Sequence, residues 1–308
     1  KGEIDRINCF GGLIYLNNRQ PIEFSQLSLD VGSETYVPKE FLINQTSFDL
    51  ISIKPFDIFI DWLNDKDQNI NKDFGHIFSV IGSGYAAIEI ALALRNRWKK
   101  KEINLHAFFD RINPRLTKIL HSLNIEIVSS GSPLKGPGIL CTGNSAPQWI
   151  IDSGLPIDLR GRILTSKTLQ VLGHQNIFAV GDCGVIKDNY RPASGVWAVR
   201  AAHTLARNLE LACKGLRLKS WSPQYRCLQL IGISDYDLKK PIACAIYGDL
   251  ILGPNQLIWK LKEHIDRSFI SRFKFLKDRS MDFIYPNNDM ACRGCAAKIP
   301  ADTLQGSL

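Results

Sequence analysis

The chain has 308 residues, which is enough for about two domains. Its hydrophobic content of 45% and mean hydropathy of -0.07 indicate a globular protein and exclude a disordered one. The net charge of +8 fits nucleic acid, a membrane surface or acidic ligands without choosing among them, but no apolar run reaches the length of about 18 residues that a membrane-spanning helix needs.

The first part of the chain predicts short strands and one helix. Two alternating runs, residues 9–15 and 21–29, flank Asn17-Asn18 and predict a hairpin. The second run continues to Gly32-Ser33, an ending that is common in any buried strand and turn. A helix is expected around residues 56–63, and the polar stretch after it fits a crossing between domains.

The most informative pattern follows an apolar run at residues 77–81. A G-x-G-x-x-A turn formed by Gly82, Gly84 and Ala87 comes next, and it leads into a helix rich in alanine and leucine and then a second strand. This is the dinucleotide-binding signature, in which Gly82 permits the tight turn, Gly84 lets the backbone approach a pyrophosphate, and Ala87 allows close helix packing. The pyrophosphate is expected at the helix N-terminus, where free N–H groups favour an anion.

A helix that merely starts after a tight turn would explain the glycines without a ligand, but the flanking strands favour the nucleotide site. Asp110 is the residue expected to bind the adenosine ribose, although it lies slightly later than the usual spacing of about 20 residues. The neighbouring Arg111 would instead suit a 2′-phosphate, so NAD is only modestly preferred over NADP.

A second motif, Gly181-Asp182, closes an apolar strand at residues 176–180. An aspartate at the carboxyl edge of a sheet suits ribityl or ribose hydroxyls, which donate to it. The alternative is an aspartate that caps the next segment. Before this motif we expect a helix, a short strand, a loop and a strand, at residues 115–123, 125–128, 129–138 and 139–143.

A helix is expected at residues 194–213, and its N-terminus near Gly195 and Val196 can face an anionic or electron-rich ligand. Strands then follow at residues 225–233, 241–247 and 250–252. Residues 257–275 repeat an apolar residue every fourth position among lysines and arginines. This pattern is more typical of a helix packed on its own protein, and it also fits a helix lying on a membrane surface.

The tail begins with a polar linker and then contains Cys292, Cys295 and Lys298. Two cysteines without a following histidine do not make a zinc site, so no metal is expected. A cysteine near a lysine can be a thiolate with a lowered pKa, although a free pair in a tail is the simpler interpretation. The eight cysteines are otherwise scattered and no signal peptide opens the chain, so we expect a cytoplasmic enzyme rather than a disulfide scaffold.

The motifs stand in the order seen in flavoproteins with two dinucleotide domains. Residues 24–33 resemble the strand that usually ends A-T-G-S, and Cys141-Thr142-Gly143 resembles the second A-T-G. Together with the glycine turn and the Gly-Asp motif, they resemble the pyridine nucleotide-disulfide oxidoreductase superfamily, most of all its type II NADH dehydrogenase branch. The resemblance implies FAD and NAD(P)H as cofactors, with Gly82, Gly84, Ala87, Asp110, Gly143, Gly181, Asp182, Gly195 and Val196 as binding residues.

The tail has a second resemblance. Cys295-x-x-Lys298-Ile299-Pro300 is similar to the catalytic loop of selenide, water dikinase, also called selenophosphate synthetase, and residues 191–200 and 259–269 resemble the form in which a flavin oxidoreductase is fused ahead of that enzyme. This resemblance implies catalytic roles for Cys295 and Lys298, and ATP and Mg²⁺ for the dikinase part beyond this chain.

Two departures limit the resemblance. The first flavin-binding G-x-G-x-x-G is absent, so we expect the chain to begin inside the flavin domain, as a fragment of a bifunctional protein. Only a short loop separates the strands at 125–128 and 139–143, so the antiparallel strands usually inserted there are expected to be lost.

We therefore expect an α/β protein with two Rossmann-like dinucleotide-binding domains, the FAD part incomplete and the NAD(P)H part abbreviated, followed by C-terminal strands and a helix. The expected divisions are partial FAD domain 1–70, NAD(P)H domain 71–150, return to the FAD domain 151–215, C-terminal strands and helix 216–277, linker 278–290 and dikinase start 291–308.

The expected function is an FAD-dependent NAD(P)H oxidoreductase that reduces a quinone or supplies reduced selenium to the dikinase. The alternatives are a selenophosphate synthetase whose flavoprotein part is degenerate and serves binding or regulation, and a membrane-surface adaptor that uses residues 257–275. Nucleic acid is not an expected partner, and a homodimer remains open.

Overall fold

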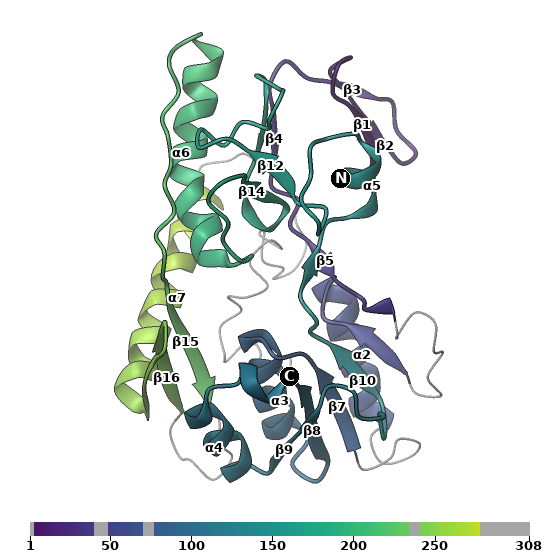
Figure 1. Cartoon of the computed structure of the whole chain (residues 1–308), viewed down its shortest axis with the longest axis vertical. Helices are drawn as coiled ribbons and strands as arrows, with labels where there is room; N and C mark the ends of the chain where they lie inside the picture. The colour runs from purple at the N-terminus through teal and green to yellow at the C-terminus, as the bar shows by residue number, and fades with distance from the viewer. Residues whose placement is uncertain (1–2, 40–48, 70–76, 234–240, 278–308) are drawn as a thin grey trace. The chain divides into compact units, whose positions relative to one another are not determined.

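The computed structural model describes residues 3–39, 49–69, 77–233 and 241–277, and these ranges fall into two compact units (Figure 1). The first unit combines Lys1–Tyr36 with Asn144–Tyr225, and the second combines Val37–Gly143 with Arg226–Leu308.

The second unit contains a five-stranded parallel sheet with the order β6-β10-β7-β8-β9. The strands are β6 (Leu50–Ser52), β7 (Ile77–Ile81), β8 (Glu102–Ala107), β9 (Ile125–Ser129) and β10 (Gly138–Leu140). Strand β7 is central and almost wholly apolar, as expected for a parallel strand covered on both faces.

Three helices cover one face of this sheet: α2 (Phe56–Asn69), α3 (Tyr85–Arg97) and α4 (Pro114–Ser122). Phe78 and Val80 of β7 point into this layer, where the ring of Phe78 lies 4.3 Å from the ring of Trp98. The prediction of a strand, turn, helix and strand is therefore confirmed, with helix bounds within a residue or two of those expected for α4.

The opposite face of the sheet is more polar. Ser79, Asn104 and His106 are buried there, and Nε2 of His106 lies 3.1 Å from Oγ of Ser79. No strand lies between β9 and β10, a stretch that the structure describes completely. The expected loss of the inserted strands thus agrees with the described chain.

A three-stranded antiparallel sheet completes the second unit: β15 (Leu228–Ile233), β16 (Ile242–Tyr247) and β17 (Leu250–Asn255). Helix α3 packs near β15, and α7 (Gln256–Lys277) packs along β16. Gly232 leaves room for the ring of Trp259 on α7, because a Cβ at Gly232 would lie 2.9 Å from that ring. The predicted strands and the C-terminal helix are present.

The first unit begins with an antiparallel sheet of β1 (Ile4–Asn8), β2 (Leu13–Leu16) and β3 (Ile22–Glu23). The turn expected at Asn17-Asn18 joins β2 to β3, and Asn18 has a positive φ of 58°. The hairpin between β1 and β2 was not predicted, and the second alternating run is divided between β3 and a separate strand, β4 (Leu27–Leu29).

The core of the first unit lies around a parallel pair. Strand β4 pairs with β13 (Ile177–Ala179), and β12 (Ile163–Thr165) pairs in parallel with β14 (Gly184–Ile186). The short strands β5 (Glu34–Thr35) and β11 (Asn144–Ser145) pair antiparallel. Helices α5 (Gln148–Asp152) and α6 (Gly195–Cys213) and the turn η2 (Gly181–Cys183) complete the unit.

The α/β fold class is confirmed by this parallel sheet and its covering helices. Among the described helices, none is both long and apolar enough to cross a membrane. The basic helix α7 differs from the prediction in its orientation, because Leu257, Leu261 and Ile265 are 74%, 44% and 38% exposed rather than packed on the protein.

Candidate functional site

The turn after β7 is built so that only glycine fits at its first position. Gly82 has a φ of +150°, and a Cβ there would collide with the carbonyl oxygen of Cys141 after β10. The same Cβ would lie 3.2 Å from the Cβ of Ala87, which is fully buried in α3. Gly82 and Ala87 thus have the tight-turn and close-packing geometry that the motif predicts.

The N-terminus of α3 is open to an anion. Gly84 is the N-cap residue, no side chain caps the helix, and its first turn has no acidic residue. A Cβ at Gly84 would meet nothing within 4 Å, so the backbone is accessible from outside. Free N–H groups at a helix start attract negative charge. These residues fit the pyrophosphate of a dinucleotide.

The ends of three adjacent strands meet at this turn. Gly82 donates its N–H to the carbonyl of His106 on β8 at 2.9 Å, and Ser83 Oγ accepts the N–H of Phe108 at 2.8 Å. Asp110 is exposed in the short turn η1 (Phe109–Arg111) that follows β8. Gly143, with a φ of 109°, follows β10 on the other side of β7. The predicted residues of the second unit therefore gather at one edge of the sheet.

The Arg111 guanidinium lies 5.0 Å from the centre of the Phe108 ring. Arg111 and Asp110, the basic and acidic candidates for the adenosine ribose, are consecutive residues of the same short turn.

A second polar site lies in the first unit, where β4 and β13 end next to each other. Ser33 Oγ is 3.3 Å from Oδ2 of Asp182 and 3.1 Å from Oδ1 of Asn144. Gly181 has a φ of +72°, and a Cβ there would collide with Oδ1 of Asp30. The carboxylate and hydroxyl groups collected here fit a ligand with several hydroxyls, such as a ribityl chain.

The pKa of Asp30 is raised above its ordinary value, first because burial disfavours the charged carboxylate and second because Asp182 is also negative. Asp30, Ser33 and Asn144 were not among the residues predicted for this site. The strand ending in Asp30 and Ser33 was the available signal in the sequence, whereas nothing local marks Asn144.

Helix α6 begins beside this site and packs against the η2 turn that contains Gly181 and Asp182. Its N-cap residue Ser194 makes no side-chain cap, so the N-terminus at Gly195 and Val196 can accept an electron-rich group. Gly181, Asp182, Gly195 and Val196 thus belong to one region of the first unit. Cys295 and Lys298 lie outside the described residues.

No protein-family model matches the chain. Ferroptosis suppressor protein 1 of Xenopus laevis is 20% identical over 264 residues, which cover 72% of this chain and 66% of that protein. The NADH dehydrogenase-like protein YutJ of Bacillus subtilis is 21% identical over 296 residues, covering 85% of this chain and 79% of that protein.

Two solved structures show the same architecture. The FAD-dependent pyridine nucleotide-disulphide oxidoreductase of Desulfovibrio vulgaris has a TM-score of 0.54 at 15% identity, with 79% of this chain and 66% of that chain covered. The sulfide:quinone oxidoreductase of Aquifex aeolicus has a TM-score of 0.66 at 12% identity, with 88% and 74% covered. The fold is that of the FAD-dependent pyridine nucleotide-disulphide oxidoreductases.

The predicted resemblance to the pyridine nucleotide-disulphide oxidoreductases thus holds at the level of the fold. The chain spans about two thirds of the Desulfovibrio and Xenopus proteins. A fusion to selenide, water dikinase finds no support in these comparisons, and neither do ATP and Mg²⁺ as cofactors.

Proposed function

We propose that the protein is an NAD(P)H-dependent flavin oxidoreductase. The observation that carries this proposal is that each unit has a strand that ends in a tight glycine turn of the kind that binds nucleotides. The turn is at Gly82 in the second unit and at Gly181 in the first. The names of the similar proteins, which include an NADH dehydrogenase-like protein and an FAD-dependent oxidoreductase, support the same activity.

In the second unit, this chain would hold NAD(P)H by its pyrophosphate. The backbone around Gly82 and Gly84 and the N-terminus of α3 provide N–H donors, and Asp110 is proposed to accept from the adenosine ribose. Gly143 would border the same nucleotide from the end of β10.

In the first unit, Asp182 would accept hydrogen bonds from the ribityl hydroxyls of FAD, with Ser33 in contact with its carboxylate and Asn144 in contact with Ser33. Gly195 and Val196 would present the N-terminus of α6 to the electron-rich edge of the flavin. The bound cofactors themselves supply the hydride chemistry.

The test is an absorbance spectrum of the natural protein that carries this sequence, recorded without oxygen before and after NADH is added. We expect a flavin band at about 450 nm that bleaches with NADH, at roughly one flavin per chain. A colourless protein, or a yellow protein that NADH and NADPH fail to bleach, would contradict the proposal. Turnover with a soluble quinone and with selenite, assayed separately, would then identify the acceptor.

We also propose, on the tail motif alone, that Cys295 and Lys298 belong to the start of a selenide, water dikinase. The support is the spacing Cys295-x-x-Lys298-Ile299-Pro300. Selenide-dependent hydrolysis of ATP by the natural protein, lost when Cys295 is replaced by alanine, would support this second activity. Normal ATP hydrolysis in the alanine variant would refute the role of Cys295.

A second candidate function is binding to an anionic membrane surface through α7. Leu257, Leu261 and Ile265 are exposed at helical spacing, and the exposed Lys260 lies beside them. The side of α7 that packs on the protein carries Trp259 and the ion pair of Lys262 with Asp266, whose atoms are 2.8 Å apart. An exposed apolar stripe next to basic residues is typical of helices that lie in a lipid interface.

A further inference from the structure

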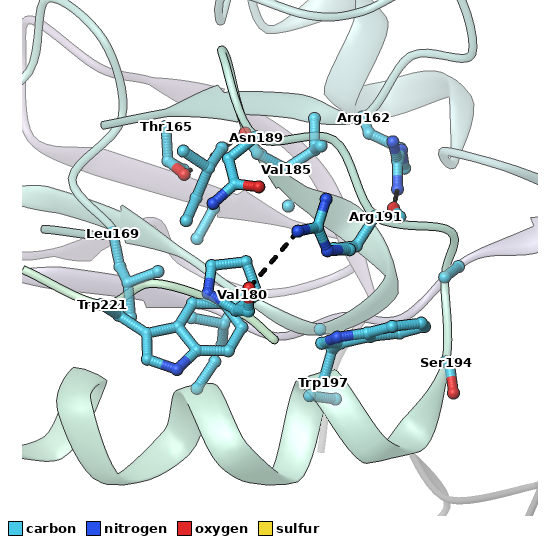
Figure 2. Close-up of a pocket in the computed structure, with 18 of the residues that line it drawn as sticks. Arg162, Thr165, Leu169, Val180, Val185, Asn189, Arg191, Ser194, Trp197 and Trp221 are labelled. Carbon is cyan, nitrogen blue, oxygen red and sulfur yellow. Dashed lines mark hydrogen bonds between the residues drawn. The ribbon is translucent and has the colours of Figure 1, made fainter. Parts of the chain in front are cut away.

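A small pocket lies inside the first unit, between the inner side of α6 and the strands β12, β13 and β14 (Figure 2). Its volume is about 40 Å³, room for roughly three water molecules. This size excludes a nucleotide or a flavin ring. The pocket shares Gly181 with the proposed flavin site, but Asp182, Gly195 and Val196 do not line it.

Arg162 is the most unusual residue of the pocket wall. Its side chain is only 3% exposed, its Nε lies 3.0 Å from Oδ2 of Asp158, and its Nη1 donates to the carbonyl of Arg191 at 2.9 Å. The ring of Tyr190 lies 4.5 Å from the guanidinium carbon. The remaining nitrogen, Nη2, is buried and has no hydrogen-bond partner in the protein. A buried guanidinium nitrogen without an acceptor is costly, so an acceptor is expected there.

The charge around Arg162 is not balanced. Arg191 also lines the pocket, and it donates to the carbonyl oxygens of Tyr190, Pro223 and Gln224 rather than to a carboxylate. Among the described ion pairs, Asp158 pairs with Arg162, and none joins a carboxylate to Arg191. An excess of one positive charge in a largely buried space favours an anion over a neutral ligand.

The pocket also offers a neutral donor and a rigid wall. Figure 2 shows the amide of Asn189 beside the guanidinium of Arg191, and the rings of Trp197 and Trp221 close the side toward α6. The indole of Trp197 is fixed because its Nε1 donates to the carbonyl of Gln224 at 3.1 Å. The walls are thus held in place without a ligand.

We propose that this pocket binds a small anion, either a tetrahedral oxyanion or a short carboxylate, beside the guanidinium groups of Arg162 and Arg191 that line it. The pocket volume limits the size of the ligand, and the unpaired guanidinium nitrogen of Arg162 favours a ligand that accepts hydrogen bonds. Together they define the class of ligand. The pocket shares Gly181 with the proposed flavin site but not Asp182, Gly195 or Val196, so the proposal does not rest on the oxidoreductase activity.

The test titrates the full chain with inorganic phosphate, sulfate and acetate at constant ionic strength, with chloride as the reference. Tryptophan fluorescence reports binding, because two tryptophans line the pocket. We expect saturable binding of at least one of the three anions, and the comparison of phosphate and sulfate with acetate distinguishes oxyanions from carboxylates.

Arg162→Lys keeps the charge but removes Nη2, and it should weaken binding about tenfold or more. Arg160→Gln removes an exposed arginine two positions away and should leave binding unchanged. If Arg162→Lys does not fold, Ala198→Val narrows the pocket while leaving Arg162 intact, and the same loss is expected. No saturable response in the wild type, or equal affinity in the wild type and the folded pocket variant, would overturn the proposal, because water alone would then satisfy Nη2.

Discussion

The hydroxyl of Ser33 lies 3.3 Å from Oδ2 of Asp182, although 149 positions separate the two residues in the chain. The contact joins the ends of the parallel strands β4 and β13, and Asn144 approaches the same hydroxyl at 3.1 Å. A carboxylate at a strand end is thereby held in a fixed orientation, which is what a hydroxyl-rich ligand requires.

Asp182→Asn should therefore weaken FAD retention by about tenfold or more, because an amide offers fewer acceptor positions to the ribityl hydroxyls and loses the charge. The measurement is the flavin content of the purified natural protein by absorbance. Asp188→Asn, an exposed aspartate in the following loop, is the matched control and should retain the flavin. Equal flavin content in the two variants would remove Asp182 from the site.

Alanine substitutions at the two glycines of the β7–α3 turn should differ in their effect on the free energy of unfolding. Gly82→Ala forces a Cβ against the carbonyl of Cys141 at a positive φ, so we expect a loss of about 2 kcal/mol or more in the free energy of unfolding. Gly84→Ala places its Cβ in open space at a φ of −86°, so the protein should stay as stable as the wild type.

Gly84→Ala should nevertheless weaken NAD(P)H binding about tenfold, because the added methyl group blocks the approach of the pyrophosphate to the backbone. Denaturant unfolding and nucleotide titration measure the two effects separately. Gly131→Ala, in an exposed loop of the same unit with nothing within 4 Å, is the control for both. A stable Gly82→Ala variant would show that the turn can relax.

Much of the fold could be predicted because its signals are local. The apolar run of β7 and the glycines after it identify the strand, turn and helix within a short window. The order of the sheet could not be predicted, since β10 inserts between β6 and β7 from a distant part of the chain. The hairpin of β1 and β2 was missed because Gly11-Gly12 was interpreted as part of a strand rather than as its turn.

The candidate sites also combine residues that local motifs predict with residues that only the folded chain brings together. Gly82, Gly84 and Asp182 lie in recognisable motifs, whereas Asp30 comes against Gly181 and Asn144 against Ser33 only through tertiary packing. For α7, the periodicity of apolar residues correctly predicts a helix, but it does not predict which side of the helix packs on the protein. That side is set by Gly232, which admits the ring of Trp259, and no local pattern contains this information.

Leu261→Glu should abolish membrane binding if α7 lies on a lipid surface. Leu261 is 44% exposed on α7, so a glutamate there is tolerated by the fold but is repelled by anionic headgroups and unfavourable in the lipid interface. Co-sedimentation with anionic phosphatidylserine vesicles and with neutral phosphatidylcholine vesicles measures the effect.

Leu216→Glu is the control for this experiment, because Leu216 is 55% exposed in the first unit and lies outside α7. The wild type and the Leu216 variant should sediment with anionic vesicles, and the Leu261 variant should remain in solution. Membrane binding by α7 is refuted if the wild type stays in solution, or if both variants sediment equally.

The stability of the protein should depend on pH through Glu89 of α3. Burial raises the pKa of this carboxyl from 4.5 to about 7, with Lys262 opposing the shift and Asp266 adding to it. Between these two values the folded state keeps a proton that the unfolded state has released. The free energy of unfolding should therefore fall as the pH rises from about 4.5 to about 7 and change little above that through this group.

Glu89→Gln removes the charge that burial disfavours, so the variant should be more stable than the wild type at pH 8, on the order of 2 kcal/mol. The advantage should shrink as the pH falls toward 4.5, where the wild-type carboxyl is protonated in both states. Urea unfolding at a series of pH values measures this difference, and Glu102→Gln, an exposed glutamate at the start of β8, should follow the wild type. Parallel curves for Glu89→Gln and the wild type would mean that Lys262 neutralises Glu89 in the folded protein, and that the buried carboxyl is charged at neutral pH after all.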